Sequence, residues 1–243
     1  MKNNFSAVIF SIAIVIASFT LGNAYLNRNK AKGSIAVTGL GKTDFTSDLI
    51  VWEGVFSRTN GNLQKAYADL ENDKLIVLEY LKSKGISESS IVFNAVKTDQ
   101  KKKNIYSDDG KYMGEEFIGY ILRQSLQIES KDVEKVEKTS REITELLNQG
   151  VQLYSSPPRY YYTALEDLKI ELISNATENA RLRAEKIAGN SGSVLKDLIS
   201  AKMGIFQITG QNSAEDYSWG GAFNTSSKEK TASITVKLNY NVK

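Results

Sequence analysis

The chain has 243 residues, of which 41% are hydrophobic and 24% charged, a composition typical of a folded globular domain. Its formal net charge is only +3, so the composition gives no electrostatic argument for nucleic-acid binding. Cysteine and histidine are absent, which excludes disulfides, thiol nucleophiles, Ser–His–Asp triads and zinc sites made from Cys or His. Any enzymatic chemistry would therefore have to use carboxylate, Lys, Tyr, Ser or Thr groups.

The most hydrophobic segment lies near the N-terminus. Residues Phe5 to Gly22 carry no charge and follow a single lysine, Lys2. As a helix this segment would span about 27 Å, close to the hydrocarbon thickness of a membrane. Gly22-Asn23-Ala24 also fits a small-x-small cleavage site, so residues 1–26 are expected to be a retained membrane anchor or a cleaved signal peptide. A buried core helix is the less favoured alternative, because the segment has no polar face.

The rest of the chain is expected to form a linker, residues 27–33, and one domain, residues 34–243. Arg28, Lys30 and Lys32 follow the apolar segment, whereas only Lys2 and the amino terminus precede it, so charge alone does not give the orientation. Either role of the segment would send the domain to the membrane or across it.

Hydrophobic periodicity predicts the elements of the first part of the domain. They are a strand Ile35–Thr38, a turn Gly39–Asp44, a strand Leu49–Arg58 that is apolar on both faces, a helix Leu63–Leu81 and a strand Ile91–Lys97. Asn60 or Asn62 is expected to cap the helix and Gly85 to end it, while Asp108-Asp109-Gly110 indicates a turn.

The centre of the chain, Glu116–Gly150, changes from a two-residue hydrophobic period to a helical one. Its strand has one apolar face, interrupted only by Gln124, and that face comprises Ile118, Tyr120, Leu122, Leu126 and Ile128. A helix follows, capped by Ser130 or Asp132 and closed by Gly150. The apolar stripe of this helix comprises Val133, Val136, Ile143, Leu146 and Leu147.

The last third contains two short strands, a long helix and two further strands. These are Val151–Tyr154, Arg159–Tyr162, the helix Leu165–Ala188 ended by Gly189 or Gly192, a broken strand Val194–Thr209, a loop Gly210–Lys228 and a strand Thr231–Val242. The stripe of the helix, which includes Leu168, Leu172 and Ile187, is rich in alanine at Ala176, Ala180 and Ala184, which predicts a close approach to the surface beneath it.

The element order is ββαββαβ(β)αββ after the apolar helix. This order predicts an α+β fold with about three helices packed on mixed or antiparallel sheets. A helix–Gly–strand pattern recurs at residues 81–93 and 147–154, which indicates an internal duplication.

Three motifs carry a resemblance to a known family. They are Ile35-x-Val37-x-Gly39-x-Gly41, the central Gly119-Tyr120 with Gln127–Val133, and Ala176-x-x-x-Ala180-Arg181-x-x-Ala184-x-x-Ile187-Ala188 followed by Gly192. In order and spacing, over about Ser34 to Tyr240, the chain resembles the SIMPL-domain family of bacterial envelope proteins. The resemblance implies an α+β domain that is secreted or anchored in the envelope, often self-associating, loosely linked to stress tolerance and without established catalytic residues. The turn 189–195 lacks the second glycine often found there, and a retained anchor would differ from many exported relatives.

Four other patterns are weaker. Ala36–Thr43, which contains Lys42, fits a loosened phosphate-binding loop, but such a loop needs a helix directly after it and the pattern here continues as strand. The aromatic residues of Arg159–Tyr162, with Trp219 and Phe223, could stack on a ligand, although core or interface packing is the favoured interpretation. The acidic pairs Asp108-Asp109 and Glu115-Glu116 are expected on a solvated turn or edge, and Lys101–Lys103 on a solvated loop.

The sequence therefore predicts no catalytic, cofactor-binding or metal-binding residue. We expect a non-enzymatic cell-envelope protein that assembles with copies of itself or binds a partner outside the cytoplasm, and that also contacts the membrane if its N-terminal helix is uncleaved. The alternative is an envelope hydrolase or small-ligand binder with carboxylate and Tyr groups in a cleft near loops 155–163 and 210–228. Convergent side chains with perturbed pKa values in that cleft would favour the alternative.

Overall fold

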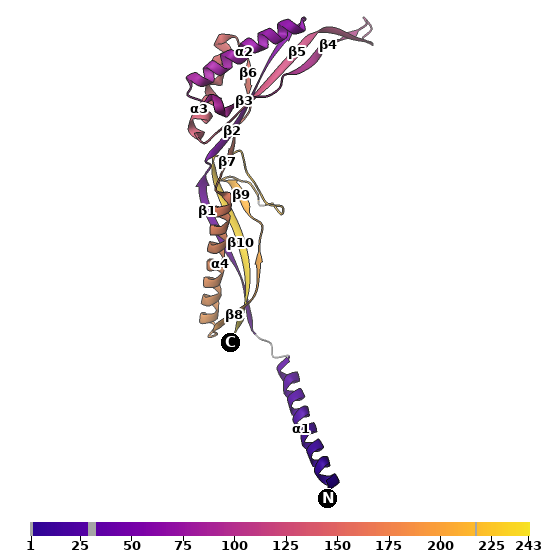
Figure 1. The fold of residues 1–243 in the computed structure, drawn as a ribbon, viewed down its shortest axis with the longest axis vertical. Helices are drawn as coiled ribbons and strands as arrows, with labels where there is room; N and C mark the ends of the chain where they lie inside the picture. The colour runs from indigo at the N-terminus through magenta and orange to yellow at the C-terminus, as the bar shows by residue number, and fades with distance from the viewer. Residues whose placement is uncertain (1, 29–32, 217) are drawn as a thin grey trace. The chain divides into compact units, whose positions relative to one another are not determined.

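The computed structural model describes residues 2–28, 33–216 and 218–243 (Figure 1). The helices are α1 (Lys2–Arg28), α2 (Leu63–Ser83), α3 (Val133–Glu142) and α4 (Leu165–Asn190), with 3-10 helices η1 (Glu88–Ser90) and η2 (Ile143–Gln149). The strands are β1 (Ser34–Thr46), β2 (Leu49–Asn60), β3 (Ile91–Phe93), β4 (Lys97–Tyr106), β5 (Tyr112–Ser130), β6 (Leu153–Ser155), β7 (Arg159–Tyr161), β8 (Leu195–Met203), β9 (Gln207–Gly210) and β10 (Glu229–Val242). The α+β class with antiparallel sheets is confirmed, and most of the predicted linker lies outside the described residues.

The chain divides into two compact units. Unit 1 comprises Met1–Leu40, Asn175–Gly204 and Thr235–Lys243, and unit 2 comprises Gly41–Ser174 and Ile205–Ile234. In unit 1 the strand order is β1-β10-β8, and α4 packs on the sheet with its alanine stripe. Ala176, Ala180 and Ala184 are all fully buried, as the sequence predicted.

The predicted turn at Gly39–Asp44 is wrong. β1 continues without a break to Thr46, and the chain turns only at Ser47 and Asp48. Gly39 is needed for space rather than for a turn, because a Cβ added there would lie 2.0 Å from the carbonyl oxygen of Ala176 in α4. The continuous strand also places no helix N-terminus after Lys42, so the phosphate-loop geometry is not formed, as predicted.

In unit 2, β2 and β5 form the centre of an antiparallel sheet with the order β3-β5-β2-β6. Its inner face is covered by α2, α3 and η2 and is fully buried at the largest side chains: Ile50, Trp52, Phe56, Leu122, Leu126 and Ile128. On the other face of β2, Val51 is buried but Leu49 and Val55 are only half-buried, so the second apolar face is partly covered. Asn62 caps α2 and Asp132 caps α3, each through its side-chain oxygen.

The topology of unit 2 contains the predicted internal repeat. β2 is followed by α2, Gly85 and the short strand β3, and β5 is followed by α3, η2, Gly150 and the short strand β6. β3 pairs with β5 and β6 pairs with β2, so each short strand joins the long strand of the other repeat. This exchange joins the two repeats into one sheet.

The interruption at Gln124 has a structural reason. Gln124 is 5% exposed, and its side-chain nitrogen donates to the carbonyl oxygen of Asn94 at 2.9 Å. Asn94 lies directly after β3, and its backbone N–H still donates to the carbonyl of Ser125 in β5 at 2.9 Å before β4 begins at Lys97. The predicted single strand Ile91–Lys97 is therefore interrupted at residues 94–96, where the carbonyl of Asn94 accepts from a side chain, while β3 and β4 on either side both pair with β5.

Two further sequence expectations need correction. Ile118 was expected on the buried face of β5, yet it is 42% exposed, because the sheet ends at Gly119. Gly119 has φ +145° and packs against the carbonyl of Asn60, a position that a side chain would not tolerate, and a register shift follows on β4. Lys101–Lys103 lie in β4 rather than in a loop, since β5 continues as strand beyond the sheet and pairs with them.

Leu147 and Ile187 are exposed, against expectation. After Glu142 the helix tightens into η2, whose three-residue turn keeps Ile143 and Leu146 aligned but moves Leu147 off the buried stripe. In α4 the buried stripe repeats every four residues through Ala188, which leaves Ile187 beside it and 49% exposed. The break in the strand Val194–Thr209 is confirmed at residues 204–206.

Candidate functional site

The loops 155–163 and 210–228, where the sequence allowed a cleft, meet the start of β10 in unit 2. The backbone N–H of Tyr160 donates to the carbonyl of Thr225 at 2.7 Å. Tyr160 is 6% exposed and belongs to the hydrophobic core, and the ring of Tyr162 packs on Phe45 with centroids 4.9 Å apart. The tyrosine run is thus used for packing, which was the favoured interpretation.

Lys230 is the unusual group of this region. Its side chain is buried, and its Nζ donates to the backbone carbonyl of Tyr160. Burial lowers the pKa of Lys230 from 10.5 to about 8. The adjoining cavity is only about 10 Å³, enough for about one water molecule and too small for a substrate. The strand prediction began at Thr231 and missed this residue, although Lys230 continues the buried alternation of Ala232 and Ile234.

We expect replacement of Lys230 by methionine to stabilise the protein at pH 7. A lysine whose folded-state pKa is lowered carries a full penalty below pH 8, and the penalty disappears as the pH rises towards 10.5. Wild-type stability should therefore gain up to about 3 kcal/mol over that window, at about 1.4 kcal/mol for each pKa unit. The stability of Lys230→Met should not rise over this pH range. At pH 7 the variant avoids the cost of the buried charge, but it loses the hydrogen bond to Tyr160, which reduces its extra stability by about 1 kcal/mol. Urea unfolding of both proteins at pH 7 and 9.5 measures the difference, and parallel pH profiles would contradict it.

The loop after β9 presents an exposed tryptophan. Trp219 is 96% exposed, and the backbone around it is held by the buried side chain of Gln207. Gln207 donates to the carbonyl of Ser218 at 2.8 Å and accepts from the N–H groups of Ser218 and Ala222 at 3.2 and 2.7 Å. These three bonds fix the turn that carries Trp219. The side chains of Trp219 and Phe223 are both exposed, so packing in the core does not account for these two aromatic residues.

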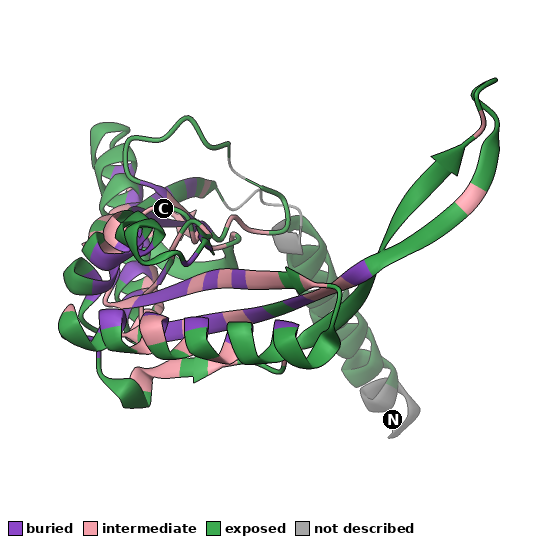
Figure 2. Cartoon of the chain, turned by 90° about the horizontal axis from the view of Figure 1, so that it is seen from above, coloured by how far each residue is buried: buried purple, intermediate pink, exposed green. Residues whose placement is uncertain are grey.

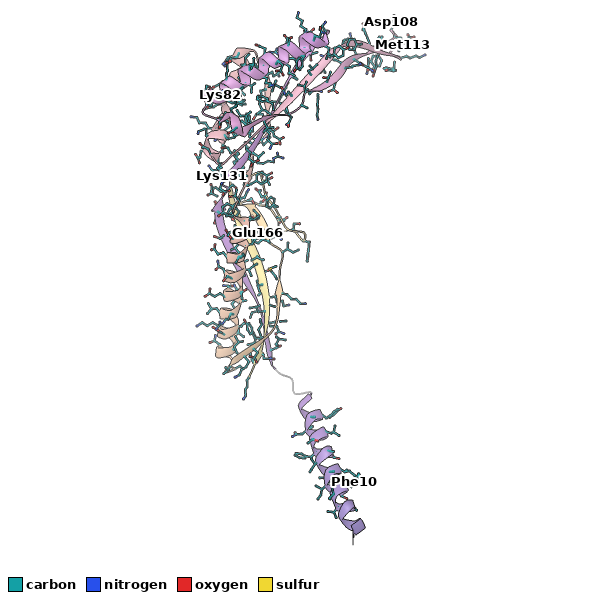
Figure 3. All side chains as sticks on the ribbon, viewed as in Figure 1. Phe10, Lys82, Asp108, Met113, Lys131 and Glu166 are labelled. Carbon is teal, nitrogen blue, oxygen red and sulfur yellow. The ribbon has the colours of Figure 1, made fainter. Side chains whose placement is uncertain are left out.

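A two-stranded ribbon, defined as residues 97–118 of β4 and β5, extends from unit 2. Figure 2 shows it reaching away from the helices and sheet of that unit, exposed over nearly its whole length. Asp108 and Met113 lie at its tip (Figure 3). Six large apolar side chains of the ribbon are 42–68% exposed: Ile105, Tyr106, Tyr112, Met113, Phe117 and Ile118. The acidic pair at 108–109 forms the tip turn, as predicted.

Both strands of the ribbon have an open edge. Within the part of the chain that the structure describes, β4 pairs only with β5, and the outer part of β5, residues 112–118, pairs only with β4. Lys102 and Glu115 form an ion pair at 2.9 Å, and Lys103 lies opposite Glu116. The lysine run Lys101–Lys103 and the acidic pair Glu115-Glu116 therefore face each other across the ribbon. Among the described residues, no group of three or more acidic side chains is placed to hold a metal ion.

Two comparisons with known proteins bear on this chain. No curated protein matches it. The family model described as "SIMPL: Protein of unknown function (DUF541)" matches residues 35–242, which include nearly all of the chain after α1 and its linker. The chain therefore belongs to the SIMPL family.

Proposed function

We propose that the protein is a non-enzymatic, membrane-anchored protein whose domain lies outside the cytoplasm and assembles with copies of itself through the ribbon. The observation that carries the proposal is the ribbon itself. An isolated two-stranded hairpin is at best marginally stable in water, and this one leaves six large apolar side chains 42–68% exposed. A partner that pairs with the ribbon would cover them.

The charges of the two open edges favour a second copy as that partner. β4 carries Lys97 and Lys101–Lys103 against a single acid, Asp99, whereas residues 112–118 of β5 carry Glu115 and Glu116 and no base. If β4 of one copy paired with β4 of another, lysines would lie opposite lysines. Repulsion between such lysines is a usual protection of edge strands against pairing. Pairing β4 of one copy with the outer part of β5 of the next would oppose unlike charges. Such a head-to-tail contact generates a ring or a filament.

Shortening the ribbon should separate assembly from folding. Replacing residues 103–116 by Asn-Gly joins the paired residues Lys102 and Phe117 through a two-residue hairpin turn. None of the removed side chains is buried, so the melting temperature should stay near that of the wild type. The native mass should fall to that of a monomer. An unchanged native mass would contradict the role of the ribbon.

The location rests on α1. Residues Ala7–Leu26 form a helix long and apolar enough to cross a membrane, and none of it is buried in the protein. We expect protease added outside the cytoplasmic membrane to digest the domain, and a periplasm-active reporter fused after Lys243 to be active. Protection of the domain from that protease would place it in the cytoplasm.

The same proposal includes the absence of catalysis and a link to stress tolerance. The most perturbed group near the predicted cleft, Lys230, is sealed beside a cavity of about 10 Å³, which supports a structural role. The link to stress rests on the family resemblance alone. Loss of stress survival in cells that produce only the shortened-ribbon protein would connect assembly with that role.

A further inference from the structure

One end of unit 1 is formed by four chain segments that meet. The backbone N–H of Val242 donates to the carbonyl of Gly33 at 2.9 Å, and Val194 and Lys243 exchange two backbone hydrogen bonds. The backbone N–H of Ser193 donates to the carbonyl of Ala188 at 2.9 Å, so the end of α4 also lies here. We call this the anchor end of unit 1, because the chain from α1 enters here.

The length of the chain keeps the anchor end near the membrane. α1 ends at Arg28 and the described chain resumes at Gly33, five residues later. Whatever path residues 29–32 follow, five residues span at most about 18 Å. If α1 crosses a membrane, the anchor end therefore lies within reach of its headgroups.

The anchor end and the residues that lead to it are basic. Lys186 and Lys196 lie on or next to the four segments, and Arg28, Lys30 and Lys32 precede them in the sequence. Two acidic residues, Glu185 and Asp197, lie close to these lysines in the sequence. Glu185 forms an ion pair with Arg181 at 2.9 Å, so Asp197 is the acid that remains to offset the charge of the lysines. This balance is complementary to anionic phospholipid rather than to zwitterionic lipid.

An apolar groove lies beside these lysines. It has a volume of about 540 Å³ and is lined by Ala36, Val37 and Thr38 of β1 and by Leu182, Arg183, Lys186 and Ile187 of α4. No acidic residue lines it. Ile187 and Val194 are 49% and 61% exposed, so apolar and basic groups share one surface, as in proteins that rest on a membrane interface.

We propose that the anchor end of unit 1 docks on anionic phospholipids of the membrane that holds α1, with Lys186 and Lys196 on headgroup phosphates and the groove against the acyl boundary. The proposal rests on the membrane anchorage in the proposed function and does not depend on assembly.

Because the sequence has no cysteine, one introduced cysteine can be labelled selectively at a chosen position. We would put an environment-sensitive fluorophore at Ile187→Cys, at Ser18→Cys inside α1, and at Ser89→Cys, an exposed control in unit 2. The full chain is reconstituted in nanodiscs of phosphatidylcholine alone or of equal parts phosphatidylcholine and phosphatidylglycerol, and quenching by brominated lipid is measured. The label at Ser18 should be quenched in both, that at Ile187 only with phosphatidylglycerol, and that at Ser89 in neither.

Charge reversal separates lipid docking from other causes. Lys186→Glu with Lys196→Glu should abolish the quenching at Ile187, whereas the matched pair Lys65→Glu with Lys131→Glu, both exposed in unit 2 and outside the ribbon, should preserve it. Each lysine near an anionic surface is worth about a fivefold change in partitioning. Ile187 quenching that is absent, or equal in both lipids, would overturn the proposal while the Ser18 signal upholds the anchor. Loss of the Ser18 signal would overturn the anchor and the docking together.

Discussion

Replacing Gly39 by alanine is expected to lower the melting temperature by roughly 6–12 °C. The added Cβ would lie 2.0 Å from the carbonyl oxygen of Ala176 and 2.5 Å from the amide nitrogen of Ala180. Both are backbone atoms of α4, so neither can move away by a change of side-chain rotamer. β1 and α4 would have to separate, which we expect to cost about 3 kcal/mol, the upper end of overpacking. At about 2–4 °C for each kcal/mol in a chain of this size, thermal unfolding should show the change clearly.

Two other variants complete this test. Gly189→Ala makes the same chemical change in α4, but no atom lies within 4 Å of its added Cβ, so the melting temperature should stay constant or rise slightly. Ala180→Leu overpacks the same contact from the helix side. The alanine stripe packs on the chain's own sheet and not on another subunit. In Ala180→Leu the mass of the native assembly and the melting temperature should therefore fall together. A wild-type melting temperature for Gly39→Ala would mean that β1 and α4 do not pack as closely as described.

Removal of the Asp73 carboxylate should destabilise unit 2 by about 2–4 kcal/mol. Asp73 is 1% exposed and binds Arg58 through two bonds of 2.5 and 2.6 Å, and Arg58 also donates to the carbonyl of Gly150 at 2.9 Å. The hydrogen bond to Asp73 raises the pKa of Arg58. Removing one partner of a buried pair typically costs 3–5 kcal/mol, and Arg58 is exposed enough to recover some hydration.

The matched control for Asp73→Ala is Asp69→Ala, one turn earlier on α2. Asp69 is exposed, so its loss should change the free energy of unfolding by no more than about 0.5 kcal/mol. Urea denaturation of the two variants compares them directly. Equal midpoints for Asp73→Ala and Asp69→Ala would show that the pair with Arg58 contributes nothing to stability.

The sequence was sufficient where one local pattern decides the structure. The alternation in β2 and β10 and the four-residue alanine repeat of α4 each depend on neighbours within a few residues. For the helix caps the sequence predicted Asn60 or Asn62 and Ser130 or Asp132, and the structure selects Asn62 and Asp132. The helix–Gly–strand repeat is also visible in local sequence. In the sheet, β3 pairs with β5 and β6 pairs with β2, so the short strand of each repeat joins the long strand of the other.

The failures depend on contacts that are distant in sequence. Gly39 looked like a turn residue because glycine serves turns and close approaches alike, and only the position of Ala176 distinguishes the two. β4 has no apolar alternation because neither of its faces is buried, so nothing in its own residues indicated a strand. For this reason the sequence does not predict the ribbon, although it shows both the lysine run Lys101–Lys103 and the acidic pair Glu115-Glu116 that face each other across it.

The most direct test of assembly through the ribbon uses two single-cysteine variants, Lys103→Cys and Glu116→Cys. Neither can form a disulfide within its own chain, since the protein has no other cysteine. Under mild oxidation we expect the mixed sample to yield covalent dimers well above either variant alone, because β4 of one copy lies beside β5 of the next. Cross-linking no greater than that of a Ser89→Cys control, or cross-linking of Lys103→Cys chiefly with itself, would contradict head-to-tail pairing of the ribbons.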